Sequence, residues 1–314
     1  MRIAVADLGT NSTRLLIADV DADGRREEVE RRTDVTRLGD GVDATGRLGE
    51  EAMERVHECL AEYAALAEQA GAERKVAVAT SAVRDAGNGP AFRAAVERRH
   101  GFRAQVISGE TEARLTFLGA TAGRTGGPTL VFDIGGGSTE YVIGFPGETP
   151  SFNVSTRLGS VRQSERHLRA DPPTPYELIE LARAVSELVT AGVPEDLRRA
   201  TGEGIAVAGT ATSLAAIDQE LERYDPARVH GYALTLDAAE QITTALASMP
   251  VGERRRVTGL LPARAPTIVA GAVILVESMR AFELEWVTVS EADILHGIAI
   301  SEGLYGGEHG GTTG

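Results

Sequence analysis

The stretch VFDIGGGSTE, residues 131–140, predicts a strand that leads an aspartate, Asp133, into a turn of three glycines. A second strand-like run follows at residues 141–145. Glycines let backbone N–H groups come close to an anion, because no Cβ blocks the approach. The next two residues add hydroxyl donors. The predicted phosphate-binding turn therefore comprises Gly135, Gly136, Gly137, Ser138 and Thr139.

Two carboxylates flank this turn, Asp133 before it and Glu140 after it. Two negative charges beside a bound anion are consistent with a cation between them, and carboxylates are ligands that Mg²⁺ accepts. We therefore predict that Asp133 and Glu140 bind Mg²⁺. A plain hairpin turn is the alternative, and this pattern alone does not decide between the two.

A second copy of the pattern favours the phosphate-and-metal interpretation. The stretch ADLGTNSTR, residues 6–14, also lies between strand-like runs, at residues 3–6 and 15–20. Its aspartate, first glycine, serine and second threonine match those of the later stretch, and its arginine falls where Glu140 falls. Two such hairpins predict a duplicated domain with a cleft between the copies. The first copy adds Asp7, Gly9, Thr10, Asn11, Ser12 and Arg14 as candidate phosphate-binding residues.

The composition is that of a globular protein, with 314 residues, 42% of them hydrophobic and 25% charged. No apolar run approaches the roughly 20 residues of a membrane span, and the N-terminus enters a strand at once, so we expect neither membrane partner nor signal peptide. The single cysteine, Cys59, predicts a cytoplasmic protein without disulfides. A net charge of −14 disfavours nucleic acid as a partner.

Phosphate recognition must rest on arginine, because Lys75 is the only lysine and the P-loop pattern is absent. The guanidinium fork suits phosphate oxygens. Arg84 follows a predicted strand at residues 75–80, where α/β folds bind ligands at strand carboxyl ends; a surface ion pair is its alternative role. Arg162, in the loop that opens a helix expected at residues 164–169, is a further candidate.

A third possible anion site lies where the predicted strand 204–208 meets a helix. Gly209 and Thr210 begin that connection, and small residues at a helix N-terminus can bind an anion. A tight packing turn explains them equally well. The segment 19–30 fits an EF-hand calcium pattern, but we reject that site because its flanks alternate like strands and Arg26 stands where an apolar side chain belongs.

The polar, glycine-rich segment 121–128 is the predicted domain boundary. We expect an N-terminal domain at residues 1–124 and a C-terminal domain at residues 125–292. A last helix at about 293–305 is expected to pack back on the first domain, and residues 306–314 are expected to be a disordered tail. Further helices are predicted at 49–70, 90–100, 176–189, 250–260 and 265–279, and further strands at 103–107, 151–155 and 286–290.

The order of motifs resembles one family. The hairpin at Asp7, the stretch TSAVR at 80–84, SGETEARL at 108–115, DIGGGSTE at 133–140 and AGTATSLA at 208–215 together resemble the exopolyphosphatase and guanosine pentaphosphate phosphohydrolase family (Ppx/GppA). That family lies within the actin-like ATPase superfamily. The resemblance runs from Asp7 to about Ser301. It implies two ribonuclease-H-like α/β domains with a cleft between them.

The resemblance also implies the chemistry, Mg²⁺-dependent release of terminal phosphate from inorganic polyphosphate or from the alarmone pppGpp. Glu112 resembles the family's general base, whereas a carboxylate such as Glu110 in a first helical turn is explained by the helix dipole. Asp133 and Glu140 resemble its metal and water-positioning carboxylates, and Arg84 its phosphate-binding arginine. A monovalent cation such as K⁺ is a further expected cofactor, and a homodimer a further expected assembly.

The chain departs from the family pattern in two respects. It lacks the all-helical C-terminal domains of long members, which favours short polyphosphates, and His296 stands where an arginine is common. The first hypothesis is an exopolyphosphatase, and the second a pppGpp phosphohydrolase with the same chemistry. A kinase of the actin-like superfamily and a non-catalytic nucleotide-binding module are the alternatives from other classes. The motif SGETE at residues 108–112 favours hydrolysis over the kinase, and the presence of both Glu112 and Glu140 argues against the non-catalytic module.

Overall fold

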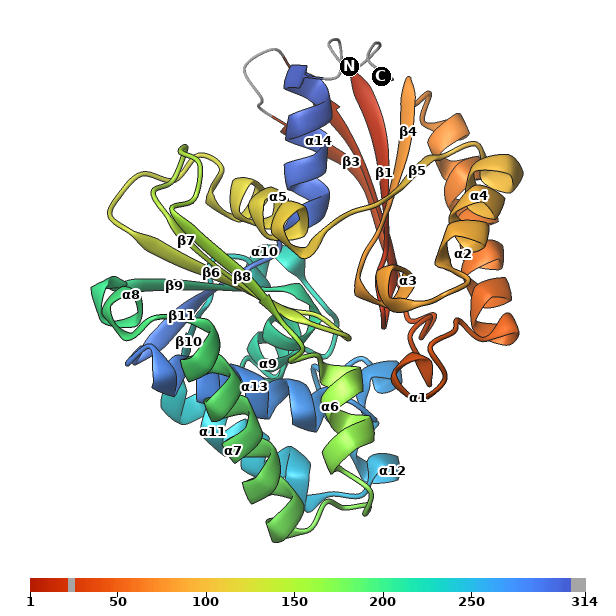
Figure 1. Cartoon of the computed structure of the whole chain (residues 1–314). Coiled ribbons are helices and arrows are strands. Elements are labelled where there is room, and N and C mark those ends of the chain that lie inside the picture. The colour runs from red at the N-terminus through yellow and green to blue at the C-terminus, as the bar shows by residue number, and fades with distance from the viewer. Residues whose placement is uncertain (22–25, 306–314) are drawn as a thin grey trace. The chain divides into compact units, whose positions relative to one another are not determined.

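The computed structural model describes residues 1–21 and 26–305, so the tail expected at 306–314 lies outside the described residues. The chain forms two compact units (Figure 1). Unit 1 comprises Met1–Gly119 and the residues from Ile294 onward, and unit 2 comprises Ala120–Asp293. The sequence places the boundaries at 124/125 and 292/293. In the structure the first division falls inside helix α5 (Gly109–Thr121).

Unit 1 contains a five-stranded mixed sheet in the order β3-β2-β1-β4-β5. The first three strands are antiparallel neighbours, whereas β4 and β5 run parallel to β1. Their bounds are β1 (Arg2–Leu8), β2 (Thr13–Val20), β3 (Arg26–Asp34), β4 (Arg74–Ala79) and β5 (Arg103–Val106). The helices besides α5 are α1 (Val42–Thr45), α2 (Glu50–Gln69), α3 (Ser81–Asp85), α4 (Gly89–His100) and α14 (Ile294–Tyr305).

Alternation along β1 fixes which face of this sheet each helix covers. Successive strand residues point to opposite faces. Ala4 and Ala6 join a buried cluster with α2 and α4, and Ile3 and Val5 join another with α5 and α14. Helices α2 and α14 lie on opposite faces of this sheet (Figure 1). Asp7 has the same parity as Ile3 and Val5, so its carboxylate belongs to the α5 and α14 side of the sheet.

Unit 2 contains a six-stranded sheet in the order β10-β11-β9-β6-β7-β8. Its strands are β6 (Thr129–Ile134), β7 (Thr139–Gly144), β8 (Phe152–Thr156), β9 (Glu203–Val207), β10 (Ala233–Thr235) and β11 (Trp286–Ser290). Its helices are α6 (Ser160–His167), α7 (Pro175–Gly192), α8 (Glu195–Ala200), α9 (Ala208–Asp218), α10 (Pro226–Val229), α11 (Leu236–Ser248), α12 (Val251–Arg254) and α13 (Ile268–Ala281), with a 3₁₀ turn at Pro262–Arg264.

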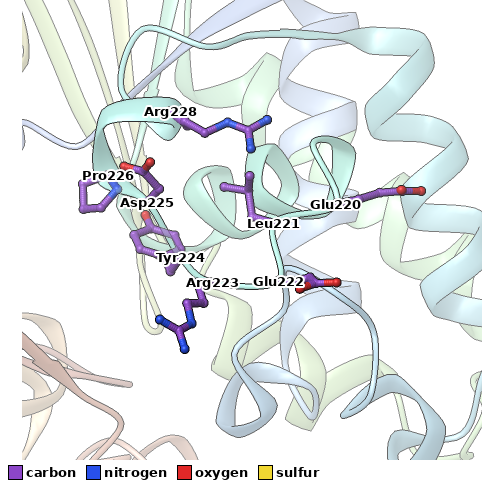
Figure 2. Close-up of a pocket in the computed structure, with 8 residues that line it drawn as sticks. All are labelled: Glu220, Leu221, Glu222, Arg223, Tyr224, Asp225, Pro226 and Arg228. Atoms are coloured by element: carbon purple, nitrogen blue, oxygen red, sulfur yellow. The ribbon is translucent and has the colours of Figure 1, made fainter.

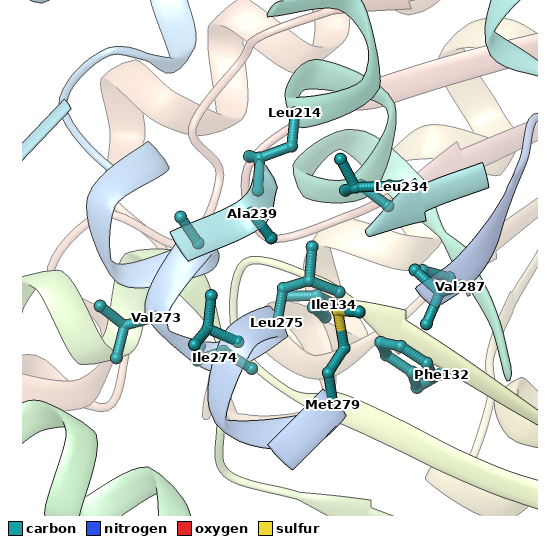
Figure 3. Close-up of a cluster of buried hydrophobic side chains, with 14 of the residues drawn as sticks. Phe132, Ile134, Leu214, Leu234, Ala239, Val273, Ile274, Leu275, Met279 and Val287 are labelled. Atoms are coloured by element: carbon teal, nitrogen blue, oxygen red, sulfur yellow. The ribbon is translucent and has the colours of Figure 1, made fainter. Parts of the chain in front are cut away.

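The core of unit 2 packs one sheet face against α7, α9, α11 and α13. Phe132 and Ile134 of β6 and Leu275 and Met279 of α13 meet in this cluster (Figure 3). Burying such large side chains contributes roughly 1.5–3 kcal/mol each. Because β6 alternates, Asp133 points to the face opposite this core.

Five strands of unit 2 repeat the arrangement of unit 1. The order β8-β7-β6-β9-β11 has the same parallel and antiparallel neighbours as β3-β2-β1-β4-β5. The predicted duplication of a ribonuclease-H-like α/β domain is therefore confirmed, and the antiparallel β10 is an addition to unit 2.

Two predicted helices differ from the structure. The helix expected at 164–169 begins earlier, at Ser160, for a reason given with the site below. The helix expected at 250–260 is only the single turn α12. Gly259 ends this region in a left-handed conformation with φ of 84°, where an added Cβ would lie 2.4 Å from the carbonyl oxygen of Ala216. Within residues 1–21 and 26–305, no helix has the length and apolar character that a membrane crossing requires.

Candidate active site

The glycine turn of unit 2 joins β6 to β7, and its two flanking carboxylates lie opposite each other. Asp133 pairs with Glu140 in the antiparallel register. Directly opposite residues of an antiparallel pair project from the same sheet face. The turn closes with a 3.0 Å hydrogen bond from the Gly135 N–H to the Ser138 carbonyl oxygen. Local register therefore brings the two predicted metal ligands together.

The turn of unit 1 repeats this geometry. Asp7 pairs with Arg14 in the register between β1 and β2, as Asp133 pairs with Glu140. The Gly9 N–H donates to the Ser12 carbonyl oxygen over 3.0 Å, which matches the bond in unit 2. The duplication proposed from the sequence thus extends to individual hydrogen bonds.

The two turns differ in charge. In unit 1, Arg14 Nη2 lies 2.7 Å and its Nε 3.0 Å from Asp7 Oδ2, so the aspartate is paired with a cation from its own hairpin. In unit 2 the equivalent position holds a second carboxylate. Asp133 is 7% and Glu140 1% exposed, so both carboxylates are buried. Like charges directly opposite each other in a sheet are destabilising, which favours a cation at the turn of unit 2 rather than at that of unit 1.

The donor set of unit 2 fits Mg²⁺. The Ser155 hydroxyl donates a 2.6 Å hydrogen bond to Glu140 Oε1 and so orients that carboxylate. No group of three or more His, Cys, Asp or Glu side chains that could hold a metal occurs in the part of the chain that the structure describes. Mg²⁺ commonly uses one or two carboxylates and completes its shell with water and substrate phosphate, so two carboxylates suffice.

Both turns leave backbone N–H groups available to an anion. Residues 10–12 and 136–138 are buried, and among the described residues their N–H groups have no hydrogen-bond partner. Buried backbone N–H groups are nearly always paired in native structures. A row of three such groups in each copy therefore indicates a ligand with acceptor oxygens, as phosphate has.

Arg162 lies against the turn of unit 2. Its Nε donates a 2.8 Å hydrogen bond to the Gly137 carbonyl oxygen, and its side chain is buried. Burial lowers the pKa of this guanidinium, with a smaller contribution in the same direction from Arg166. The guanidinium remains charged, because arginine starts far above neutral pH. The sequence placed Arg162 among the phosphate ligands, and the structure places its charge directly behind the glycines.

Thr139 requires a correction. Its side chain is fully buried, and its hydroxyl donates to the Leu158 carbonyl oxygen. A threonine hydroxyl has one proton to donate, so this hydroxyl holds the hairpin to the following loop and is not a phosphate donor. Its counterpart Thr13 is likewise fully buried and bonded to the Thr36 hydroxyl over 2.9 Å.

Glu112 and Arg84 meet in unit 1. Arg84 Nη1 lies 3.1 Å from Glu112 Oε2 and also donates a 2.9 Å hydrogen bond to the Ile107 carbonyl oxygen. Glu112 is 8% exposed, in the first turn of α5. Arg84 is therefore an ion-pair residue, but its partner is the predicted general base rather than a surface carboxylate. Glu110, two residues earlier, is exposed.

The third strand-to-helix connection, between β9 and α9, carries a cation that we did not predict. A Cβ added to Gly209 would lie 1.6 Å from Arg264 Nη1, so the guanidinium of Arg264 rests directly on this glycine. Thr210 is buried against α13, where a Cβ on Gly271 would lie 2.5 Å from its hydroxyl oxygen. These contacts are those of a packing turn with an arginine against its backbone, and the anion site at this connection stays a prediction.

Two other features involve none of the contacts described above. His296, on α14, lies 3.7 Å from Glu28 of β3. A shallow pocket of about 580 Å³ follows α9 and is lined by three carboxylates and two arginines (Figure 2). None of the residues predicted from the sequence lines it: the lining is Glu220, Leu221, Glu222, Arg223, Tyr224, Asp225, Pro226 and Arg228.

A second repeated motif escaped the sequence analysis. The tetrapeptide Thr-Arg-Leu-Gly occurs at residues 36–39 and again at 156–159. In unit 1 the motif follows β3 and donates hydrogen bonds to the turn, and in unit 2 it begins with the last residue of β8 and packs against the turn through Gly159. Comparing the two halves of the chain residue by residue beyond the first hairpin would have revealed it.

Comparison with known proteins agrees with this architecture. The model of the Ppx/GppA phosphatase family matches residues 16–305. "Exopolyphosphatase 2" of Mycobacterium tuberculosis is 40% identical over 96% of this chain and 98% of its own length. "Exopolyphosphatase 1" of Mycobacterium leprae is 31% identical over 96% of this chain and 89% of its own.

Solved structures of similar sequence have the same fold. The crystal structure of an exopolyphosphatase-like protein superimposes with a TM-score of 0.89 at 34% identity, covering 96% of this chain and 99% of that one. The Aquifex aeolicus member of the Ppx/GppA family gives a TM-score of 0.82 at 32% identity, covering 98% of this chain and 99% of that one. The chain therefore belongs to the Ppx/GppA phosphatase family.

Proposed function

We propose that this protein is an exopolyphosphatase, a phosphoanhydride hydrolase that releases the terminal phosphate of inorganic polyphosphate. One observation carries the proposal: two equivalent turns of buried residues each present three backbone N–H groups without a protein partner among the described residues. Repeated anion sites suit a substrate that is itself a repeat of phosphates. The relatives named exopolyphosphatase support the same substrate class.

Phosphoryl transfer depends on positioning and on stabilising the charge of the equatorial oxygens rather than on covalent chemistry. The proposed roles follow. A water oxygen attacks the terminal phosphorus, Glu112 accepts the proton of that water, and the anhydride oxygen leaves with the bonding electron pair. Arg84 holds the Glu112 carboxylate in place through their 3.1 Å contact. The turn amides donate to the phosphate oxygens.

Mg²⁺ is the proposed cofactor, with Asp133 and Glu140 as its protein ligands. When bound, it supplies positive charge to the phosphate oxygens. These side chains are buried on one sheet face, and Ser155 orients the second of them. The paired Asp7 of unit 1 lacks this role, because Arg14 already neutralises it.

The test is phosphate release from inorganic polyphosphate of defined lengths, from pppGpp and from ATP, assayed side by side with and without Mg²⁺. We expect the highest kcat/KM for polyphosphate and little phosphate release without Mg²⁺. A higher kcat/KM for pppGpp would instead identify a pppGpp phosphohydrolase. Phosphate transfer from ATP to an acceptor, without hydrolysis of polyphosphate, would identify a kinase.

A further inference from the structure

One copy of the Thr-Arg-Leu-Gly motif packs against each glycine turn, and we call each copy a clamp. Clamp 1 is residues 36–39, after β3, and clamp 2 is residues 156–159, at the end of β8. The threonine of each clamp bonds to the strand residue just after the turn. Thr36 shares a 2.9 Å hydroxyl–hydroxyl bond with Thr13, and the Thr156 hydroxyl donates to the Thr139 carbonyl oxygen over 2.9 Å.

Clamp 2 leads directly into α6, whose first N–H groups bond to the glycine turn. The Ser160 N–H donates to the Gly135 carbonyl oxygen over 2.9 Å, and the Val161 N–H donates to the Gly136 carbonyl oxygen over 2.9 Å. The Arg162 N–H also reaches Gly136, over 3.2 Å. The first N–H groups of a helix lack intrahelical partners, so the glycine carbonyls cap α6. This is why α6 begins at Ser160 and not where the sequence predicted.

In unit 1 the N–H groups of clamp 1 itself bond to the carbonyl oxygens of the turn, without a helix. The Arg37 N–H donates to the Asn11 carbonyl oxygen over 2.9 Å, and the Gly39 N–H donates to the Thr10 carbonyl oxygen over 2.8 Å. Arg37 adopts a left-handed conformation, with φ of 51°, which is uncommon for a residue with a side chain. The clamp therefore keeps an unfavourable backbone conformation while it holds the carbonyls of the turn.

The last residue of each clamp has no room for a side chain. A Cβ on Gly159 would lie 2.2 Å from the Gly136 carbonyl oxygen, and a Cβ on Gly39 would lie 2.1 Å from Thr10 Cγ2. Carbon atoms in contact normally stay about 3.5–4.0 Å apart. Glycine is thus required in both clamps for the chain to approach its turn.

We propose that the two clamps, clamp 2 together with the start of α6, are positioning elements for substrate binding: bonds to the carbonyl oxygens of residues 10–11 and 135–137 hold the N–H groups of residues 11–12 and 136–138 toward phosphate. Each carbonyl shares a planar peptide unit with the N–H of the next residue. A hydrogen bond to the carbonyl oxygen therefore fixes the orientation of that N–H toward the ligand. This inference rests on the proposed function, since it assigns phosphate to those N–H groups. It adds a second duplicated element to the site.

The two clamps make different predictions on substitution. Gly159→Ala meets backbone atoms, which no second substitution can remove. Gly39→Ala meets the side chain of Thr10, at a position where unit 2 has Gly136. Adding Thr10→Gly removes that side chain and leaves the Thr10 carbonyl oxygen as the nearest atom, at 3.2 Å. The second substitution should therefore restore clamp 1.

The experiment measures KM and kcat for tripolyphosphate with Mg²⁺, and the rise in Tm that inorganic phosphate produces, in Gly159→Ala, Gly39→Ala and Gly39→Ala/Thr10→Gly. Controls are Gly49→Ala and Gly202→Ala, where an added Cβ meets nothing within 4 Å and φ is not positive. We expect kcat/KM to fall by about 10²-fold in Gly159→Ala and Gly39→Ala, as for a catalytic group misplaced by about 1 Å. The double variant should recover about tenfold or more of the loss in unit 1.

A folded Gly39→Ala variant that keeps the normal kcat/KM and phosphate-induced rise in Tm would overturn the proposal. A double variant no better than Gly39→Ala would also overturn it, even if Gly159→Ala does not fold. Failure of the proposed function is a separate result. If the wild-type protein releases no phosphate from polyphosphate, the rise in Tm with inorganic phosphate still reports whether the clamps position the turn amides.

Discussion

Arg84 Nη1 lies 3.1 Å from Glu112 Oε2, so the arginine that the sequence assigns to phosphate is ion-paired with the carboxylate that it assigns to the base. Removing one partner of this partly buried, hydrogen-bonded charge pair leaves the other without its counter-charge. The contact also orients the Glu112 carboxylate, as the proposed role of general base requires. The same arginine is anchored by the Ile107 carbonyl oxygen.

Replacement of the base is the first prediction. Glu112→Gln keeps the shape of the side chain but cannot accept a proton at neutral pH, so we expect kcat to fall by about 10²–10⁴-fold. Binding of polyphosphate, measured calorimetrically, should change little. Glu110→Gln is the matched control, because Glu110 is an exposed carboxylate in the same helical turn. Near-normal turnover of Glu112→Gln would remove Glu112 from the role.

The second prediction concerns Mg²⁺. Asp133→Asn and Glu140→Gln each remove one proposed ligand charge, so the Mg²⁺ concentration for half-maximal activity should rise by about tenfold or more. Asp7→Asn is the matched control in unit 1. There the arginine pairing leaves no role for a cation, and the Mg²⁺ dependence should stay as in the wild type, whatever happens to kcat. An unchanged Mg²⁺ requirement in both unit 2 variants would place the ion elsewhere.

The third prediction is about stability. Asp7 is 4% exposed and accepts hydrogen bonds from both Nε and Nη2 of Arg14. Arg14→Gln should therefore lower the free energy of unfolding by about 3–5 kcal/mol. Removing both charges in Asp7→Asn/Arg14→Gln should recover much of this loss. Urea unfolding of the two single variants and the double variant gives the coupling energy directly. Additive losses would show that the two charges do not depend on each other.

The fourth prediction concerns a buried histidine pair in unit 1. His57 Nδ1 and His100 Nε2 lie 3.0 Å apart on α2 and α4, with the ring of Phe92 beside them. Burial lowers the pKa of His57 to about 4, with further lowering by Arg99 and His100 and an opposing effect of Glu54. Burial likewise lowers the pKa of His100. Both rings are therefore neutral in the folded protein at neutral pH.

The direction of the pH dependence of stability follows from the number of protons bound in the folded and the unfolded state. Below pH about 6.5 the two histidines bind protons in the unfolded chain but stay neutral in the folded protein. The free energy of unfolding should therefore fall as the pH drops from about 6.5 toward 4. Urea midpoints across that range measure the slope. In His57→Gln/His100→Gln the slope should be smaller, because neither side chain titrates there. An equal slope in the double variant would assign the acid sensitivity to other groups.

Short local patterns predicted the fold and the turns, because strand alternation and glycine spacing act over a few residues. The pairing of Asp133 with Glu140 follows from hairpin register alone. The sequence did not predict which residues from distant segments contact the turns and the connection between β9 and α9. The Leu158 carbonyl oxygen accepts a hydrogen bond from the Thr139 hydroxyl, and the Arg264 guanidinium packs against Gly209. Each depends on where loops return in three dimensions, which no local spacing encodes.

The last prediction concerns substrate length. The net charge of the chain is −14, so phosphate units that extend beyond the turns meet a surface on which carboxylates outnumber arginines. Each added unit should contribute little binding free energy, and salt should screen that contribution within a Debye length of about 8–10 Å. We expect kcat/KM to level off at short polyphosphates and intermediate lengths to appear on a gel during digestion of long ones. Digestion to the end without intermediates would contradict this. A homodimer that joins two sites into one basic groove would then be tested by measuring the molar mass in solution with and without polyphosphate.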